Sequence, residues 1–172
     1  SGDAKQGTIF FADALGGDSD ASTYDGYIIY DHTSSERALR FGTAATERMR
    51  ITSSGSVGVG ITPSAWGGDQ VPVQVGASAL SHYDMNGSGS TFLSNNYFFD
   101  GATKAIFYGY TSDYYQSSGN HIWRSSGITS AGATASLTER MRIGPAGDVS
   151  IGTSISPPVG LTITADEDYH GV

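Results

Sequence analysis

A six-residue phrase that occurs twice constrains the fold of this chain more than any other feature. Thr46–Ile51 and Thr138–Ile143 both read Thr-Glu-Arg-Met-Arg-Ile, at an offset of 92 residues. The match continues downstream at the same offset with Gly55 and Gly147, Val57 and Val149, Val59 and Ile151, and Gly60 and Gly152. Self-similarity at a fixed period is the signature of repeated structural units. The sequence therefore predicts two copies of one module.

The residue pattern inside the repeat predicts β-strands. In the first copy Glu47, Met49 and Ile51 alternate with two arginines, and a Val-Gly-Val-Gly stretch follows. A period of two is typical of a strand. The segments that join the two strands, residues 52–55 and 144–147, end in glycine as a type I turn prefers. Each copy is thus predicted to contain a hairpin.

A helix over residues 34–50 is the alternative, because Thr33 and Glu36 could form a capping box. Gly42 interrupts that run, and Leu39 with Phe41 already fits a strand, so we rank the helix second. The other β-branched and aromatic runs, bounded by Gly, Asp and Ser, predict further short strands at residues 8–11, 27–30, 97–99, 105–110 and 121–124.

These patterns predict an all-β fold class, built of short strands and hairpins in two related modules. The first module is placed at 1–62 and the second at 71–153. Residues 63–70 are a connector, and 154–172 begin a following module. Upstream, residues 26–30 are taken to precede the first copy as residues 119–123 precede the second.

The chain is short of the side chains that fill a core. Leu, Ile, Val and Phe make up 33 of 172 residues, about 19%, and with no cysteine a disulfide framework is excluded. Short strands with so few aliphatics bury little surface against the chain entropy. We therefore expect assembly with identical chains, and expect the core of that oligomer to contain Met49, Ile51, Val57, Val59, Met141, Ile143, Val149 and Ile151.

The glycines of the valine stripe support the same expectation, because a glycine lets another backbone approach closely. Arg48, Arg50, Arg140 and Arg142 are predicted to share a strand face in each copy, with acidic residues of neighbouring chains as their partners.

Net charge and motifs exclude several classes of function. The formal charge is −8 and the nine basic residues form no cluster, which disfavours nucleic acid as a partner. No apolar run reaches the length of about 20 residues that spans a bilayer, so no membrane insertion is expected. No catalytic or cofactor motif occurs, and the four histidines lack metal-ligand spacing. We predict no enzyme activity, no catalytic residue, no cofactor and no metal.

The repeat closely resembles modules of bacteriophage tail fibres. Glu47–Ile51 followed by Gly55–Gly60 is the specific part of the resemblance, which extends to residues 7–11, 26–32, 39–41, 96–101, 109–110 and 119–123. The resemblance implies an elongated homotrimeric fibre segment located in the virion, extracellular, in contact with other virion tail proteins and the host surface. Such modules often precede an endosialidase-type chaperone domain. Residues 62–95 do not match the pattern.

Aromatic residues are the candidates for ligand contact, since flat apolar faces among small polar residues are typical of contact surfaces. They are Trp66, Tyr108, Tyr110, Tyr114, Tyr115 and Trp123. The alternative is that these rings fill space in a core that is poor in aliphatics.

The function predicted from these observations is attachment of a phage virion to the host cell through surface glycan or lipopolysaccharide. Three identical chains would convert weak single contacts into firm attachment. One alternative is a tailspike-type depolymerase that cleaves host polysaccharide with two carboxylates. A second alternative is a bacterial or prophage surface adhesin.

Overall fold

The computed structural model describes residues 6–12, 25–33, 35–67, 70–83 and 89–152, and the backbone of 161–163. These residues form fifteen strands and no helix, which confirms the all-β prediction. The alternative helix over residues 34–50 is wrong, because two strands occupy most of that range. The chain divides into two compact units, the first made of Ser1–Ser64 and Val71–Gly76, the second of Ala65–Gln70 and Ala77–Val172.

The first unit is a sheet of six strands in sequence order. The strands are antiparallel except for the last pair, which is parallel. They are β1 (Gln6–Phe11), β2 (Gly26–Asp31), β3 (Leu39–Thr43), β4 (Thr46–Ile51), β5 (Val57–Val59) and β6 (Val73–Val75).

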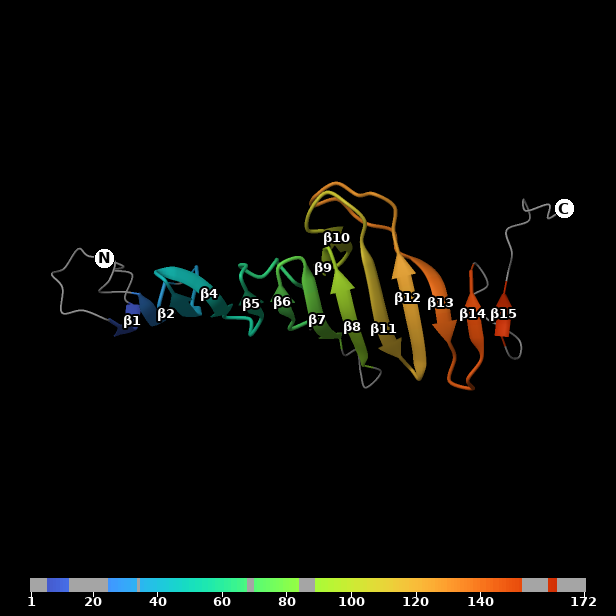
Figure 1. Cartoon of the computed structure of the whole chain (residues 1–172), viewed down its shortest axis with the longest axis horizontal. Helices are drawn as coiled ribbons and strands as arrows, with labels where there is room; N and C mark the ends of the chain where they lie inside the picture. The colour runs from blue at the N-terminus through green and yellow to red at the C-terminus, as the bar shows by residue number, and fades with distance from the viewer. Residues whose placement is uncertain are drawn as a thin grey trace. The chain divides into compact units, whose positions relative to one another are not determined.

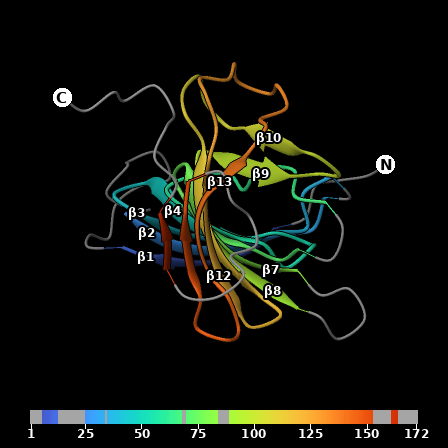
Figure 2. The same cartoon turned by 90° about the vertical axis from the view of Figure 1, so that its right-hand side faces the viewer.

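The second unit contains a seven-stranded sheet and a separate pair of strands (Figure 1). The sheet runs β7 (Ser78–Tyr83), β8 (Ser90–Asn95), β11 (Ser112–Ser117), β12 (Asn120–Ser125), β13 (Thr138–Ile143), β14 (Val149–Ile151) and β15 (Leu161–Ile163). The pair is β9 (Tyr97–Phe99) with β10 (Thr103–Ala105). Figure 2 shows this pair lying across one end of the long strands.

The strand order of the first unit recurs in the second. Strands β8, β11, β12, β13, β14 and β15 follow one another as β1 to β6 do, again with a parallel last pair. The repeated phrase lies in β4 and β13. Each of these strands pairs with the strand before it, and both pairs contain a β-bulge, after Phe41 in β3 and after Trp123 in β12. Strand β12 therefore occupies the place of β3, so the expected correspondence of residues 119–123 with 26–30 is wrong.

The bulge changes which side chains share a face. Gly42 pairs with Glu47, and Arg40 pairs with Arg50, so Glu47 lies on the face of Arg50 rather than with Met49. The Glu47 carboxylate accepts two hydrogen bonds from the Arg50 guanidinium, at 2.6 and 2.9 Å. This contact raises the pKa of Arg50 above its usual value. The sequence alternation had assigned Glu47 to the opposite face.

The arginines of the repeat find partners within their own chain, so partners on neighbouring chains are not needed. Arg142 is bound by Glu139, two oxygens against two nitrogens, as Arg50 is by Glu47. The other arginine of each copy is the extra residue of the bulge. Its Nε donates to a hydroxyl of the preceding strand at 3.0 Å in both copies, Arg48 to Thr43 and Arg140 to Ser125. The repeat is thus one set of contacts used twice.

One face of the first sheet is apolar across all six strands. Directly paired residues point to the same face, and one continuous row of pairs contains Ile9, Ile28, Phe41, Met49, Val59 and Val75. The adjacent row adds Tyr30, Leu39, Ile51, Val57 and Val73. At the two ends of the first row, Ile9 and Val75 each keep 57% of their surface exposed.

The opposite face of this sheet carries Phe10, Tyr27 and Ile29 beside polar side chains, and its most buried side chains are polar. Gln74 is completely buried. Its Oε1 accepts from the Ser64 amide at 2.9 Å, and its Nε2 donates to the Gly76 carbonyl at 2.9 Å. Asp31 is also buried and accepts from Arg40 at 2.8 Å, and hydrogen bonds led by the Thr33 amide lower the pKa of Asp31. Gln74 and Asp31 are thus hydrogen-bonded where they are buried, while aliphatic side chains of the other face are exposed.

Contacts and backbone conformation within the chain explain the two glycines of the Val-Gly-Val-Gly stretch. A Cβ on Gly58 would lie 2.2 Å from the Ile61 carbonyl oxygen and 2.7 Å from the Pro63 ring, so the close approach comes from the same chain. Gly60 has a φ of +67°, which only glycine adopts readily. Close packing of neighbouring chains, expected from the sequence, is not required to explain either residue.

In the second unit a buried ion pair between Asp113 and Arg124 also binds Tyr97, and so connects β9 to the sheet. The Asp113 side chain is fully buried and accepts from Arg124 Nε at 3.0 Å and from the Tyr97 hydroxyl at 2.6 Å. Burial and the Asp113 charge raise the pKa of Tyr97 far above its ordinary value, so this hydroxyl remains a donor. Burial lowers the pKa of Arg124, but the hydrogen bonds to Asp113 together with the charge of Asp113 outweigh that effect, and the net change is upward.

We predict that Asp113→Ala lowers the free energy of unfolding by about 3 kcal/mol, because it leaves a largely buried guanidinium without its partner. Tyr97→Phe removes one hydrogen bond and should cost about 1 kcal/mol. Urea denaturation of both variants measures the difference. Equal losses in the two variants would show that the ion pair has no special role.

Candidate functional site

The structure distributes the six aromatic residues of the predicted ligand site over separate places. Trp66 is half-buried in the segment before β6. Tyr114 and Trp123 lie on one face of the second sheet, and Tyr115 lies on the other face. Tyr108 and Tyr110 belong to a loop between β10 and β11. The six residues do not form one site.

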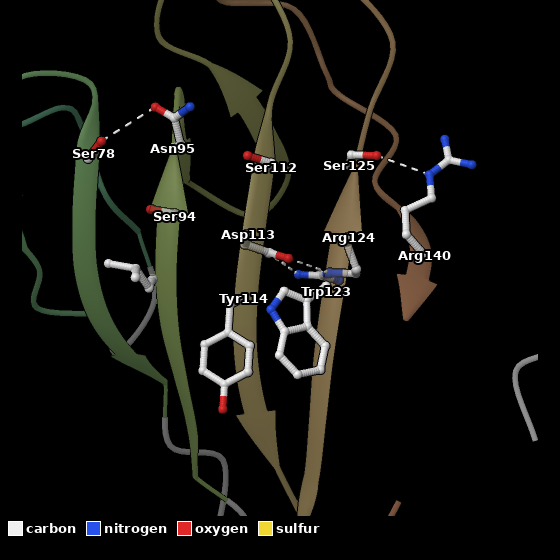
Figure 3. A pocket seen from close by; sticks show the side chains of 11 residues that line it. Ser78, Ser94, Asn95, Ser112, Asp113, Tyr114, Trp123, Arg124, Ser125 and Arg140 are labelled. Carbon is white, nitrogen blue, oxygen red and sulfur yellow. Dashed lines mark hydrogen bonds and ion pairs between the residues drawn. The ribbon is translucent and has the colours of Figure 1, made fainter. Parts of the chain in front are cut away.

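Tyr114 and Trp123 form the floor of an open hollow on the sheet (Figure 3). Their ring centroids are 4.9 Å apart, and the Tyr114 hydroxyl is hydrogen-bonded to His121. The hollow has a volume of about 550 Å³. Polar side chains border it on the side away from the rings: Ser78, Asn95, Ser112, Ser125 and Arg140.

This hollow shares its face with the predicted oligomer core. Trp123 pairs directly with Met141, and Met141 pairs with Ile151. Ile143 and Val149 form the next pair on the same face. In the first unit Met49 pairs with Val59 and Ile51 with Val57, again on a common face. The two predicted roles, ligand contact by Trp123 and chain association by Met141, therefore compete for one surface.

Tyr115 lies in a different environment. Its ring stacks on Phe92 at 5.1 Å, and the Arg124 guanidinium lies over it at 4.3 Å. Together these groups form one wall of a cavity of about 200 Å³, which Tyr83 and Phe99 also line. Tyr115 is accordingly a packing residue of the second unit as well as a cavity wall.

Tyr108 and Tyr110 are the most exposed aromatic residues among the large hydrophobic side chains of the described chain, at 73% and 66%. Phe107 and Ile128 beside them in the loops are also more than half exposed. We call these four residues, Phe107, Tyr108, Tyr110 and Ile128, the loop platform. They lie on the two long loops that rise beyond the ends of β11 and β12 (Figure 1).

One buried side chain holds the backbone of the loop platform. Asn96 Nδ2 donates to the carbonyls of Phe107 and Tyr110, each at 3.0 Å, and its Oδ1 accepts from the Phe107 amide at 2.8 Å. Asn96 has a φ of +60°, a conformation that Asn tolerates better than most residues. Because the amide group uses three hydrogen bonds on one loop, the loop has little freedom to rearrange.

The second loop is tied to the first by further hydrogen bonds. Gly109 and Thr129 exchange backbone bonds of 3.0 and 2.9 Å. At the base of the loops the completely buried Thr111 donates its hydroxyl to Ser126 Oγ at 2.7 Å. These hydrogen bonds thus hold in place the backbone that carries the exposed rings.

Sequence reasoning found two platform residues and missed three important ones. Phe107 falls within residues 105–110, which the sequence predicts as a strand. That prediction is wrong, because β10 ends at Ala105 and the next strand begins at Ser112. Ile128 lies outside the predicted strands, and the sequence gives no signal that its segment pairs with the loop at Gly109. The role of Asn96 was also missed. An Asn between two strand-like runs is a common turn residue, but its long-range contacts depend on tertiary structure.

Acidic side chains of the described ranges are mostly committed to ion pairs. Asp31, Glu36, Glu47, Asp100, Asp113 and Glu139 each lie within 4 Å of a basic nitrogen. Lys104 lies 2.6 Å from Asp100 and lowers the pKa of that carboxyl. In this part of the chain no group of three or more His, Asp or Glu residues is placed to hold a metal ion.

Comparison with known proteins adds no family assignment. No family model matches the sequence, and no curated protein matches it. None of the residues that the structure describes forms a helix capable of crossing a membrane.

We predict that Asn96→Gly, which keeps the backbone conformation but removes the amide, speeds amide hydrogen exchange at Phe107 and Gly109 at least tenfold. The loss of three hydrogen bonds lowers the free energy of local opening. Asn95→Ala is the matched control, since Asn95 makes only a 3.4 Å contact with Ser78. Unchanged exchange in Asn96→Gly would show that other contacts hold the loop.

Proposed function

We propose that this chain is a structural and adhesive segment of a bacteriophage tail fibre. It assembles as a homotrimer of two related modules per chain and attaches the virion to the host through surface glycans. Its partners are other copies of itself, other virion tail proteins and the host surface glycan or lipopolysaccharide. The mechanism is binding by several weak sites at once, and it requires no chemical step.

The single observation that supports this proposal most is the arrangement of polar and apolar side chains on the first sheet. On one face the chain's own segments bury the polar side chains of Gln74 and Asp31, while the apolar face stays open at residues such as Ile9, Val59 and Val75. Open apolar surface of this extent marks an interaction site. Further copies of the same chain can cover it with identical faces.

The second unit supports the same assembly through Leu80, Leu93 and Ile151. They lie on one face, aligned with Tyr114 and Trp123, and are exposed in the single chain. If this face packs against other chains, Tyr114 and Trp123 become interface residues. Ligand contact then falls to the aromatic residues of the loop platform. The number of chains, three, comes from the resemblance to tail fibre modules.

The ion pairs of the acidic residues favour attachment over polysaccharide cleavage. A glycosidase needs two carboxyl groups that are available to the substrate. Six acidic side chains of the described ranges are instead held by Arg or Lys. Within the described ranges these six carboxylates are therefore poor candidates for a catalytic pair, which favours the adhesive function.

We predict that the double variant Val59→Asp, Ile151→Asp loses the trimer and sediments as a single chain. These side chains are 38% and 43% exposed in the isolated chain, so the change is tolerable there. In a trimer it would bury six carboxylates in an apolar interface. Analytical ultracentrifugation measures the mass.

The control for this experiment is Ser53→Asp, which adds a carboxylate at an exposed turn between β4 and β5. It should sediment like the wild-type chain. A double variant that keeps the trimer mass would place Val59 and Ile151 away from the interface.

We also predict that the wild-type oligomer is retained on host cells and leaves their isolated polysaccharide intact. Retention is scored with labelled protein, and cleavage by the release of reducing ends. Retention without new reducing ends supports an adhesin. Release of reducing ends would instead support the depolymerase, and the absence of both would contradict attachment.

A further inference from the structure

We infer that the loop platform binds the apolar face of uncharged sugar rings. This inference rests on the proposed attachment function and adds to it both the site and the class of glycan. Three features of the molecule support it: the exposure of the rings, the rigidity of the backbone below them and the lack of charged residues in both loops.

The exposed rings have the form that sugar recognition uses. Tyr108 and Tyr110 present most of their surface to solvent, two residues apart on a loop. An aromatic ring offers a flat apolar face, and a tyrosine adds a hydroxyl that can bond to a sugar hydroxyl at the ring edge. Neither ring is needed for the core, because neither is packed inside the unit.

The rigid backbone makes weak contacts effective. The Asn96 amide fixes Phe107 and Tyr110, and the bonds between Gly109 and Thr129 fix the loop between them. Binding to a fixed loop avoids the entropy cost of ordering it. The hydrogen bonds therefore indicate a loop that is ordered before any ligand binds.

The two loops that carry the platform contain no Asp, Glu, Lys, Arg or His. None occurs in residues 105–112 or in residues 125–138, which form both loops. At the edge of this region the charges of Lys104 and Asp100 neutralise one another at 2.6 Å. A site that lacks cations has nothing to pair with phosphate, sulfate or carboxylate groups.

The lack of charged residues in the loops also favours a neutral glycan over the other possible ligands. Peripheral membrane surfaces are usually bound with basic residues around the apolar ones, and none is present here. Serine and threonine residues instead supply uncharged hydrogen-bonding groups, among them Thr129 and Ser130. Anionic sugars such as uronates or phosphorylated lipopolysaccharide cores are disfavoured for this site.

The test uses the assembled wild-type chain on a printed array that carries neutral glycans and glycans with uronate, sialate or phosphate groups. We expect retention on neutral glycans, and we expect it to change less than twofold between about 50 mM and about 500 mM NaCl. Retention on anionic glycans only, retention that salt removes, or no retention on any neutral glycan would overturn the inference.

Variants then locate the site. Tyr108→Ala with Tyr110→Ala should reduce retention on the neutral glycans at least tenfold, because each ring contributes about three- to tenfold. Tyr108→Phe with Tyr110→Phe keeps the rings and should retain most of the binding. Thr134→Ala, an exposed change in the same loops, is the control. Array binding that survives the Ala pair would exclude the platform.

Failure of this inference can be told apart from failure of the proposed function. Host-cell retention that is insensitive to the Ala pair would leave the attachment function standing and move the site elsewhere. A wild-type chain that is monomeric and binds no cells would contradict the proposed function. Binding of the platform to phosphatidylcholine vesicles or to a host protein, with no glycan retained, would overturn the sugar assignment.

Discussion

The structure depends on where the apolar side chains are placed relative to the covered face of each sheet. In the first unit the chain covers Gln74 and Asp31, and leaves valines and isoleucines open. Hydrophobic burial is the main favourable term in folding, so a sheet that gains little of it from its own chain needs another source. Identical chains offer that source, and they give the apolar residues of both units one common explanation.

The strand pairs β3 with β4 and β12 with β13 show how the sequence separates a polar face from an apolar face. One bulge places Glu47 beside Arg50, and the same bulge places Glu139 beside Arg142. Arg50 and Arg142 are each neutralised within their own strand pair, and the other face carries apolar side chains, among them Phe41 and Met49 in the first copy and Trp123 and Met141 in the second. The second unit keeps this strand pair and adds the β9–β10 pair and two long loops, so its additional structure is the part available for a distinct role.

Several features were predictable from the sequence because they follow local periodicity. The strands of the repeat, the turns between them and the common face of Met49, Ile51, Val57 and Val59 all follow from alternation at a period of two. The face of Glu47 was not predictable, since a bulge inserts one residue and reverses the alternation. Tyr114 and Tyr115 lie on opposite faces because successive side chains of a strand alternate between its two faces. The loop platform depends on the long-range contacts of Asn96, which no local pattern contains.

We propose that the apolar sheet face of one chain lies against the same face of its copies. Because the chain has no cysteine, Val59→Cys and Ser53→Cys each provide one site for a nitroxide spin label. Electron paramagnetic resonance should show strong dipolar coupling among three labels at position 59, and much weaker coupling at position 53. Labels at position 59 that show no coupling, on a protein whose fold is intact, would contradict the account.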